Sequence, residues 1–222
     1  MANQNDSFID EVTDELRRDR LYGAFRRFGW IGAVVILAIV GGASWREYSN
    51  SRDRASAQAF GDAVLAAEDG GAAGIADVDP QGSSVRAALT ELLAAGAYMA
   101  EGDDAASVAA LSEAAEIAPE GDVLRELAQL KRVIAAGSAM DASERDQILT
   151  RLSRAGAPFE LLALEQKAVA LIDAGRREDA ITLIRQIQQK NGLSQALRNR
   201  LSEMMIALGA DPAPNGDMAS GG

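Results

Sequence analysis

Two pairs of adjacent carboxylates, Asp103 with Asp104 and Glu178 with Asp179, come closest in this sequence to a catalytic arrangement. Paired carboxylates can act as general acid and base, or can bind a cation. Each pair stands at the start of a predicted helix, however, where acidic side chains stabilise the helix dipole. We therefore interpret both pairs as helix-terminal residues rather than as a reactive site.

The sequence contains no histidine and no cysteine among its 222 residues. It therefore cannot form a Ser–His or Cys–His pair, a thiolate nucleophile, a disulfide or a zinc site built from these ligands. The glycine pairs at 41–42 and 70–71 lack the strand, helix and basic residue of a phosphate-binding loop. We expect no enzymatic activity, no cofactor, no metal and no small-molecule substrate.

Charge is distributed unevenly along the chain, whose net charge is −11. Residues 1–54 contain eight arginines and eight acidic residues, whereas residues 55–222 contain 14 basic and 25 acidic residues. The C-terminal part therefore carries all of the net negative charge, which repels nucleic-acid phosphates and anionic lipid headgroups. The expected partners are proteins, not nucleic acids.

A run of eighteen uncharged residues, 28–45, lies between two arginines near the N-terminus. As a helix it is about 27 Å long at ~1.5 Å per residue, close to the ~30 Å hydrocarbon core of a bilayer. Phe28 and Trp30 lie near one end and Trp45 lies near the other, and aromatic side chains prefer the membrane interface. We predict a transmembrane helix over residues 28–48.

Two alternatives to a transmembrane helix remain for this run. A buried core helix is possible, but the acidic remainder of the chain contains no comparably apolar segment to enclose it. A cleaved signal peptide is also possible, because small residues at 41–43 offer a cleavage site. The 27 residues before the run include six acidic ones, however, whereas signal peptides begin with a short basic region.

The arginines around the run predict its orientation. Five precede it and three follow it, and positive residues near a span resist translocation. The arginines are Arg17, Arg18, Arg20, Arg26 and Arg27 before the run, and Arg46, Arg52 and Arg54 after it. We expect a cytoplasmic N-terminus and an exported C-terminal domain, which in a bacterium means the inner membrane and the periplasm.

Residues 1–27 are predicted to form a cytoplasmic amphipathic segment. Ser7 and Asp10 fit a capping box, and apolar residues then recur every four positions at Phe8, Val12 and Leu16. Two interpretations remain open for this short helix. It could dock on a cytoplasmic protein, or it could lie on the membrane surface.

After the span, helical patterns alternate with short breakers, and no segment alternates with a period of two. The 44 alanines also suit close-packed helices, so we predict an all-α fold. A helical extension and a glycine-rich linker occupy 49–82, with the helix ending near Glu68, a helical domain occupies 83–208, and residues 209–222 form a disordered tail. The predicted helices are 84–100, 104–117, 121–136, 142–154, 159–174, 177–190 and 194–208.

The predicted helices form pairs that recur at a regular spacing. Gly102 and Gly175 each end the first helix of a pair, and they lie 73 positions apart. This is close to two units of about 34 to 38 residues, the spacing of helical solenoid repeats. The sequence here resembles the tetratricopeptide repeat, which implies a helical solenoid. The matching residues are Ala95, Tyr98, Gly102, Leu111, Ala114 and Pro119 in one unit, and Ala168, Leu171, Gly175, Ala180 and Ile184 in another. The unit at 121–156 departs from the pattern and the repeat's tryptophan is absent, so an irregular helical bundle is the alternative.

A solenoid of this kind offers a concave surface to partners. The resemblance implies that this candidate groove contains Leu89, Leu92 and Met99 from one unit, and Leu162, Val169 and Ile172 from another. Such an apolar groove could accept an extended or helical protein segment. It could equally be filled by the chain's own linker or by the helix around residues 60–65.

The whole layout resembles the ancillary subunit of the SecYEG translocon: an acidic cytoplasmic segment, one span, a continuing helix and a small repeat domain. The resemblance implies a membrane-tethered periplasmic protein that binds the translocon and periplasmic chaperones and assists exported proteins. Two other functions remain open on the same features. One is a scaffold or regulator of envelope assembly or cell division, and the other is signalling through the cytoplasmic N-terminal helix.

Overall fold

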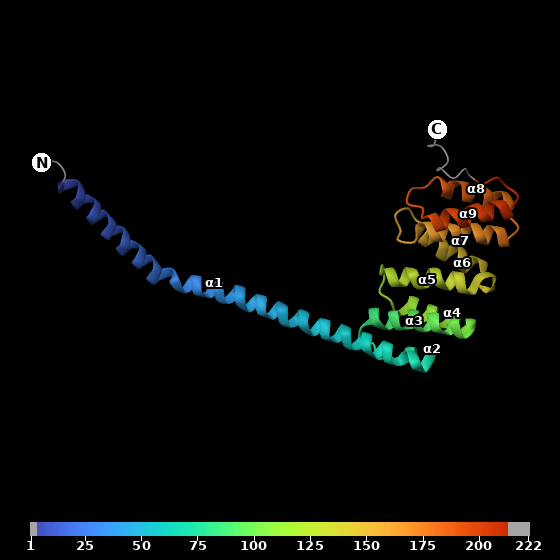
Figure 1. Cartoon of the computed structure of the whole chain (residues 1–222), viewed down its shortest axis with the longest axis horizontal. Coiled ribbons are helices and arrows are strands. Elements are labelled where there is room, and N and C mark those ends of the chain that lie inside the picture. The colour runs from blue at the N-terminus through green and yellow to red at the C-terminus, as the bar shows by residue number, and fades with distance from the viewer. Residues whose placement is uncertain (1–3, 213–222) are drawn as a thin grey trace, which may run out of the picture. The chain divides into compact units, whose positions relative to one another are not determined.

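The computed structural model describes the backbone of residues 4–212, and the side chains of residues 30–212 other than Ala33. Every regular element in this range is a helix, and no strand occurs there (Figure 1). The predicted all-α fold class is therefore confirmed for the described residues. The side chain of Phe28, the side chains of segment 1–27 and most of the predicted tail 209–222 lie outside them.

The helices from Ser84 onward begin and end within two residues of the predicted positions. Their bounds, with those of the N-terminal elements, are α1 Gln4–Ala67, η1 Glu68–Gly70, α2 Gly71–Ala76, α3 Ser84–Glu101, α4 Asp104–Ile117, α5 Val123–Ala136, η2 Gly137–Ala139, α6 Ala142–Leu152, α7 Glu160–Asp173, α8 Arg177–Gln188 and α9 Gln195–Ala207.

The chain divides into two compact units, one ending at Ala59 and the other beginning at Phe60. Helix α1 starts at Gln4, so Ser7 lies inside the helix, and the predicted capping box does not mark its start. No helix-breaking residue separates Gln4 from Ser7, so the helix extends back past the predicted cap. The C-terminal end of α1, at Ala67, agrees with the predicted end near Glu68.

The predicted glycine-rich linker, 69–82, belongs to the C-terminal unit and is helical over residues 69–76, whereas residues 77–82 have no helix. Ala72 and Ile75 of α2 are buried, and the Ala72 N–H donates a 2.8 Å hydrogen bond to Glu101 Oε1 on α3. A Cβ atom at Gly74 would lie 2.7 Å from the Ala67 carbonyl oxygen. Glycine at position 74 therefore allows α2 to pack closely against the end of α1. The glycine content that predicted a linker is here, at Gly74, a requirement of helix packing.

The helix ends follow from capping residues in the sequence. Asp103, Asp122 and Asp141 precede α4, α5 and α6, and each side chain accepts a backbone N–H of the first turn. Gly102 and Gly175 follow α3 and α7 with φ of 83° and 71°, a left-handed conformation that glycine adopts without strain. These caps explain why the breakers predicted the helix boundaries well.

The core of the C-terminal unit consists of three clusters that follow one another along the chain. The first joins α3, α4 and α5 and is rich in alanine, with Leu111 fully buried. The second centres on Leu149 and Leu152 of α6, and the third on Ile184 of α8 and Leu201 of α9. In Figure 1, the helices from α3 to α7 follow one another along the unit, and α9 lies between α7 and α8. Each helix is therefore stabilised mainly by its neighbours in sequence.

Candidate functional site

Helix α1 carries the predicted membrane span, and its large apolar side chains are exposed. Trp30 is 66% exposed, Leu37 70% and Trp45 75%. The structure describes one helix that is long and apolar enough to cross a membrane. Beyond Trp45, the Arg52 guanidinium lies 5.8 Å from the centre of the Tyr48 ring. Aromatic and arginine side chains therefore lie together at this end of the apolar run, as is typical of an interfacial anchor.

The three predicted groove residues on α3 have different environments. Met99 is 45% exposed and Leu89 is partly buried, so both are accessible to a partner. Leu92 is only 5% exposed and packs in the first core cluster with Leu111 of α4. Leu92 is therefore unavailable to a partner, because its face of α3 is the one that packs on α4.

The same helix carries an exposed apolar row that was not predicted from the sequence. Val85 and Leu93 are each 41% exposed, and Leu89 lies between them at a spacing of four residues. Residues four positions apart share one face of a helix. The four-residue spacing was readable in the sequence, but the packing partners that leave this face open were not.

The three predicted groove residues on α7 all retain access to solvent. Leu162 is 38% exposed, and Val169 and Ile172 are partly buried. Glu165 lies on the same helix face but is only 4% exposed. Its carboxylate accepts hydrogen bonds of 2.5 and 2.8 Å from Arg200 of α9. The terminal helix therefore covers part of the α7 face that was predicted to be open.

Leu162 lines a hollow of about 640 Å³ between the α6–α7 and α8–α9 connections. Lys190 and Glu160 join the two sides of this hollow through a 2.7 Å ion pair. The hydrogen bond from Lys190, together with one from the Gly156 N–H, lowers the pKa of Glu160. The Lys190–Glu160 ion pair links the α8–α9 connection to the start of α7. Leu162 therefore lies on a surface whose two sides are joined by this ion pair.

The carboxylate pairs have the helix-terminal positions that the sequence predicted. Asp103 Oδ1 accepts the Ala106 N–H at 2.9 Å, and Asp104 is the first residue of α4. Asp179 pairs with Arg176 at 2.7 Å in the first turn of α8. Within the described part of the chain, no group of three acidic side chains is close enough together to hold a metal ion.

The predicted groove residues therefore separate into two accessible groups and one core residue. Leu89 and Met99 form an apolar face on α3 with Val85 and Leu93, which were not predicted, and Leu162, Val169 and Ile172 form a second one on α7. Helix α5 packs against both α3 and α7, and its Val123 and Ile134 are 51% and 52% exposed.

No protein-family model, curated protein or solved structure matches this chain.

Proposed function

We propose that this chain is a single-pass protein of the bacterial inner membrane, with a cytoplasmic N-terminus and a periplasmic C-terminal unit that binds proteins. The observation that carries the proposal is the exposed apolar face of α1, where Leu37 is 70% exposed. Exposure of so many large apolar side chains to water is unfavourable, and a bilayer removes that cost. The arginine asymmetry around the run supports the orientation.

We interpret α3 to α8 as a tetratricopeptide-repeat-like solenoid. Positions 73 residues apart support this interpretation, because they have the same burial in both parts of the unit. Ala95 and Ala168 are 1% and 0% exposed, and Leu111 and Ile184 are both 0% exposed. Gly102 and Gly175 follow their helices with positive φ and with matching hydrogen bonds from the glycine N–H and the next N–H back to the last turn. A repeated structural unit predicts equal burial at all of these positions, whereas an irregular helical bundle gives no reason for any of the matches.

The protein-binding role that we propose is that of an ancillary translocon component, acting with periplasmic chaperones on exported proteins. The support for it is the layout of one span, a continuing helix and a small acidic helical unit. A tether raises the effective concentration of the unit beside its partner, so a weak contact is sufficient. The apolar faces of α3 and α7 are the surfaces that we assign to such contacts.

Site-specific photocrosslinking in intact membranes tests the proposal. A photoreactive residue at Met99 or Leu162 should capture a translocon subunit or a periplasmic chaperone, identified by mass spectrometry. The matched control is the same residue at Gln186, which is exposed on α8 outside both faces. Capture of cell-division or envelope-assembly proteins without any translocon subunit or chaperone would overturn the partner assignment and favour the scaffold function.

Topology is tested separately with two reporters fused after Gly209. A reporter that is active only in the periplasm should give signal, and one that is active only in the cytoplasm should not. The reverse pattern would overturn the orientation. Signal from a soluble periplasmic fraction, rather than from membranes, would indicate cleavage at 41–43 and would overturn the span.

A further inference from the structure

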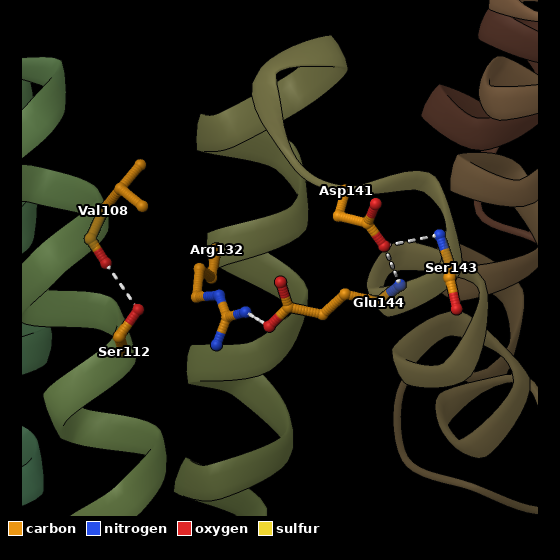
Figure 2. Close-up of polar contacts among 6 residues, drawn as sticks. All are labelled: Val108, Ser112, Arg132, Asp141, Ser143 and Glu144. Atoms are coloured by element: carbon orange, nitrogen blue, oxygen red, sulfur yellow. Dashed lines mark hydrogen bonds and ion pairs between the residues drawn. The ribbon is translucent and has the colours of Figure 1, made fainter.

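A groove of about 760 Å³ lies between α4 and the start of α6, and no residue of α3 or α7 lines it. Helix α5 packs against both flanking helices, and its C-terminal half forms the floor of the groove. Figure 2 shows the three elements side by side, with Ser112 on α4, Arg132 on α5 and Glu144 on α6. Of its lining residues, only Asp104 belongs to a motif noted in the sequence, the Asp103 and Asp104 pair.

One wall of the groove follows α4 along its length. Asp104, Val108, Ser112 and Glu116 recur every four residues, so they lie on one side of the helix over about 18 Å. Ser112 Oγ donates a 3.0 Å hydrogen bond to the Val108 carbonyl, so the hydroxyl is already engaged within its own helix (Figure 2). The side chains on the groove surface between Asp104 and Glu116 are therefore mainly small and apolar. The apolar lining residues are Ala105, Val108, Ala135, Ala136, Ala139 and Met140.

The charges of the groove are strongly unequal. Four carboxylates line it, and Arg132 is the one cation among the described lining residues. Arg132 is already paired with Glu144 across the floor (Figure 2). Asp141 caps α6 by accepting the N–H groups of Ser143 and Glu144, at 2.9 and 3.0 Å, and its carboxylate forms no ion pair with a cation of the described residues.

The carboxylates at the two ends of the α4 wall are open to a partner. Asp104 and Glu116 are both exposed, and neither carboxylate forms an ion pair within the described residues. The Arg125 guanidinium donates a 3.2 Å hydrogen bond to the Glu116 backbone carbonyl, not to its carboxylate. An acidic unit that carries two separated, unpaired carboxylates beside a small apolar floor is complementary to a positively charged amphipathic segment.

We propose that this groove binds a cationic segment of a partner protein. Two lysine or arginine side chains of that segment reach Asp104 and Glu116, and small apolar side chains between them rest on the alanine floor. A helix placed along α4 needs its two basic residues about 12 positions apart to match the carboxylates. This surface is additional to the apolar faces of α3 and α7, and its occupancy does not depend on the repeat interpretation.

The test uses the full chain in detergent micelles and a fluorescent, alanine-rich peptide of about 16 residues with two lysines about 12 positions apart. We expect saturable binding that weakens as salt is added. The same peptide with glutamates in place of the lysines should bind at least about tenfold more weakly. Equal binding of the two peptides, or no saturable binding of the lysine peptide up to millimolar concentration, would overturn the proposal.

Three variants locate the binding. Asp104→Asn with Glu116→Gln should raise the Kd of the lysine peptide by about three- to tenfold. Asp62→Asn with Asp77→Asn removes the same charge from exposed positions outside the groove, so it should leave the Kd unchanged. Ala139→Trp fills the groove from an exposed position without changing charge, and it should weaken binding as well.

Each opposite result counts against the groove. An unchanged Kd for the Asp104 and Glu116 variant or for Ala139→Trp would place the peptide elsewhere. An equal rise in the Kd of the lysine peptide for the Asp62 and Asp77 control would show that the peptide is held by non-specific electrostatic attraction. Circular dichroism of each variant checks that it is folded. Self-association of the full chain that the Asp104 and Glu116 variant abolishes would assign the groove to a second copy of the chain.

Discussion

Arg200 of α9 donates two hydrogen bonds to the Glu165 carboxylate of α7, with Nε–Oε1 and Nη2–Oε2 distances of 2.5 and 2.8 Å. The Glu165 side chain is 6% exposed, whereas the Arg200 side chain is 45% exposed. The hydrogen bond to Glu165 raises the pKa of the Arg200 guanidinium. A buried carboxylate on one helix is therefore neutralised by a cation from the terminal helix, which holds α9 against α7.

Arg200→Ala should lower the free energy of unfolding by about 1 to 2 kcal/mol, because it leaves Glu165 buried without its cation. Thermal unfolding of the full chain in detergent micelles, followed by circular dichroism, measures the change. An unfolding midpoint equal to that of the wild type would contradict the assigned role of the pair.

The matched control for this prediction is the same substitution in a Glu165→Leu background. Leu92 occupies the position 73 residues before Glu165 and is buried to a similar degree, at 5% exposed. Leucine is therefore compatible with this helix position, and without the carboxylate Arg200→Ala should cost less than about 0.5 kcal/mol. An equal cost in both backgrounds would show that Arg200 contributes through packing and not through the ion pair.

Glu91 on α3 should make the stability of the unit depend on pH. Partial burial, and then repulsion by Glu113 of α4, raise the pKa of Glu91. The folded state therefore binds this proton more tightly than the unfolded state, so the free energy of unfolding falls as pH rises through the folded pKa. Glu91→Gln should stabilise the protein at neutral pH by less than about 1 kcal/mol, and the gain should vanish below pH ~4.

Unfolding midpoints of Glu91→Gln and of wild type across this pH range measure the effect. Glu120→Gln, at an exposed carboxylate between α4 and α5, is the control for removal of one negative charge. A gain of the same size at every pH, or a loss of stability at neutral pH, would show that the ionised Glu91 is not destabilising.

The helices of the C-terminal unit were predictable because their ends depend on local chemistry. Aspartate at a helix start and glycine at a helix end act within a few residues, so Asp103, Gly102 and Gly175 were readable without the fold. Helix α2 was not predictable in this way, since Gly74 serves a close contact with the Ala67 carbonyl that only the folded chain creates.

The candidate site was predicted less well than the fold because burial depends on which helix covers which face. Leu92 and Met99 fall on one predicted face of α3, but Leu92 packs on α4 and Met99 remains exposed. Arg200 covers Glu165 from 35 positions further along the chain. The sequence around neither residue indicates that the two side chains pair. Contacts of this range are decided by the packing of whole helices.

Leu111 and Ile184 should respond alike to truncation if they occupy equivalent positions in two repeats. Both side chains are fully buried, so Leu111→Ala and Ile184→Ala should each cost about 2 to 5 kcal/mol. Ile206→Ala is the control, since Ile206 is 62% exposed and its truncation should change stability by less than about 0.5 kcal/mol. Chemical denaturation measures all three. A cost confined to one of the two core variants would argue against equivalent packing.

Gly74→Ala should destabilise the packing of α2, whereas the same substitution at Gly96 should not. A Cβ atom at position 74 would lie 2.7 Å from the Ala67 carbonyl oxygen, and backbone must shift to admit it, at a cost of about 1 to 3 kcal/mol. Gly96 lies within α3 with no atom within 4 Å of such a Cβ, so alanine there should stabilise the helix by up to about 1 kcal/mol.

Hydrogen exchange separates a local effect of Gly74→Ala from a global one. The Ala72 amide donates to Glu101, so its exchange should accelerate in Gly74→Ala and stay slow in Gly96→Ala. Equal protection of Ala72 in the two variants would mean that α2 tolerates the added methyl group. The close contact at Ala67 would then not be what glycine provides, and the helical state of segment 71–76 would need another cause.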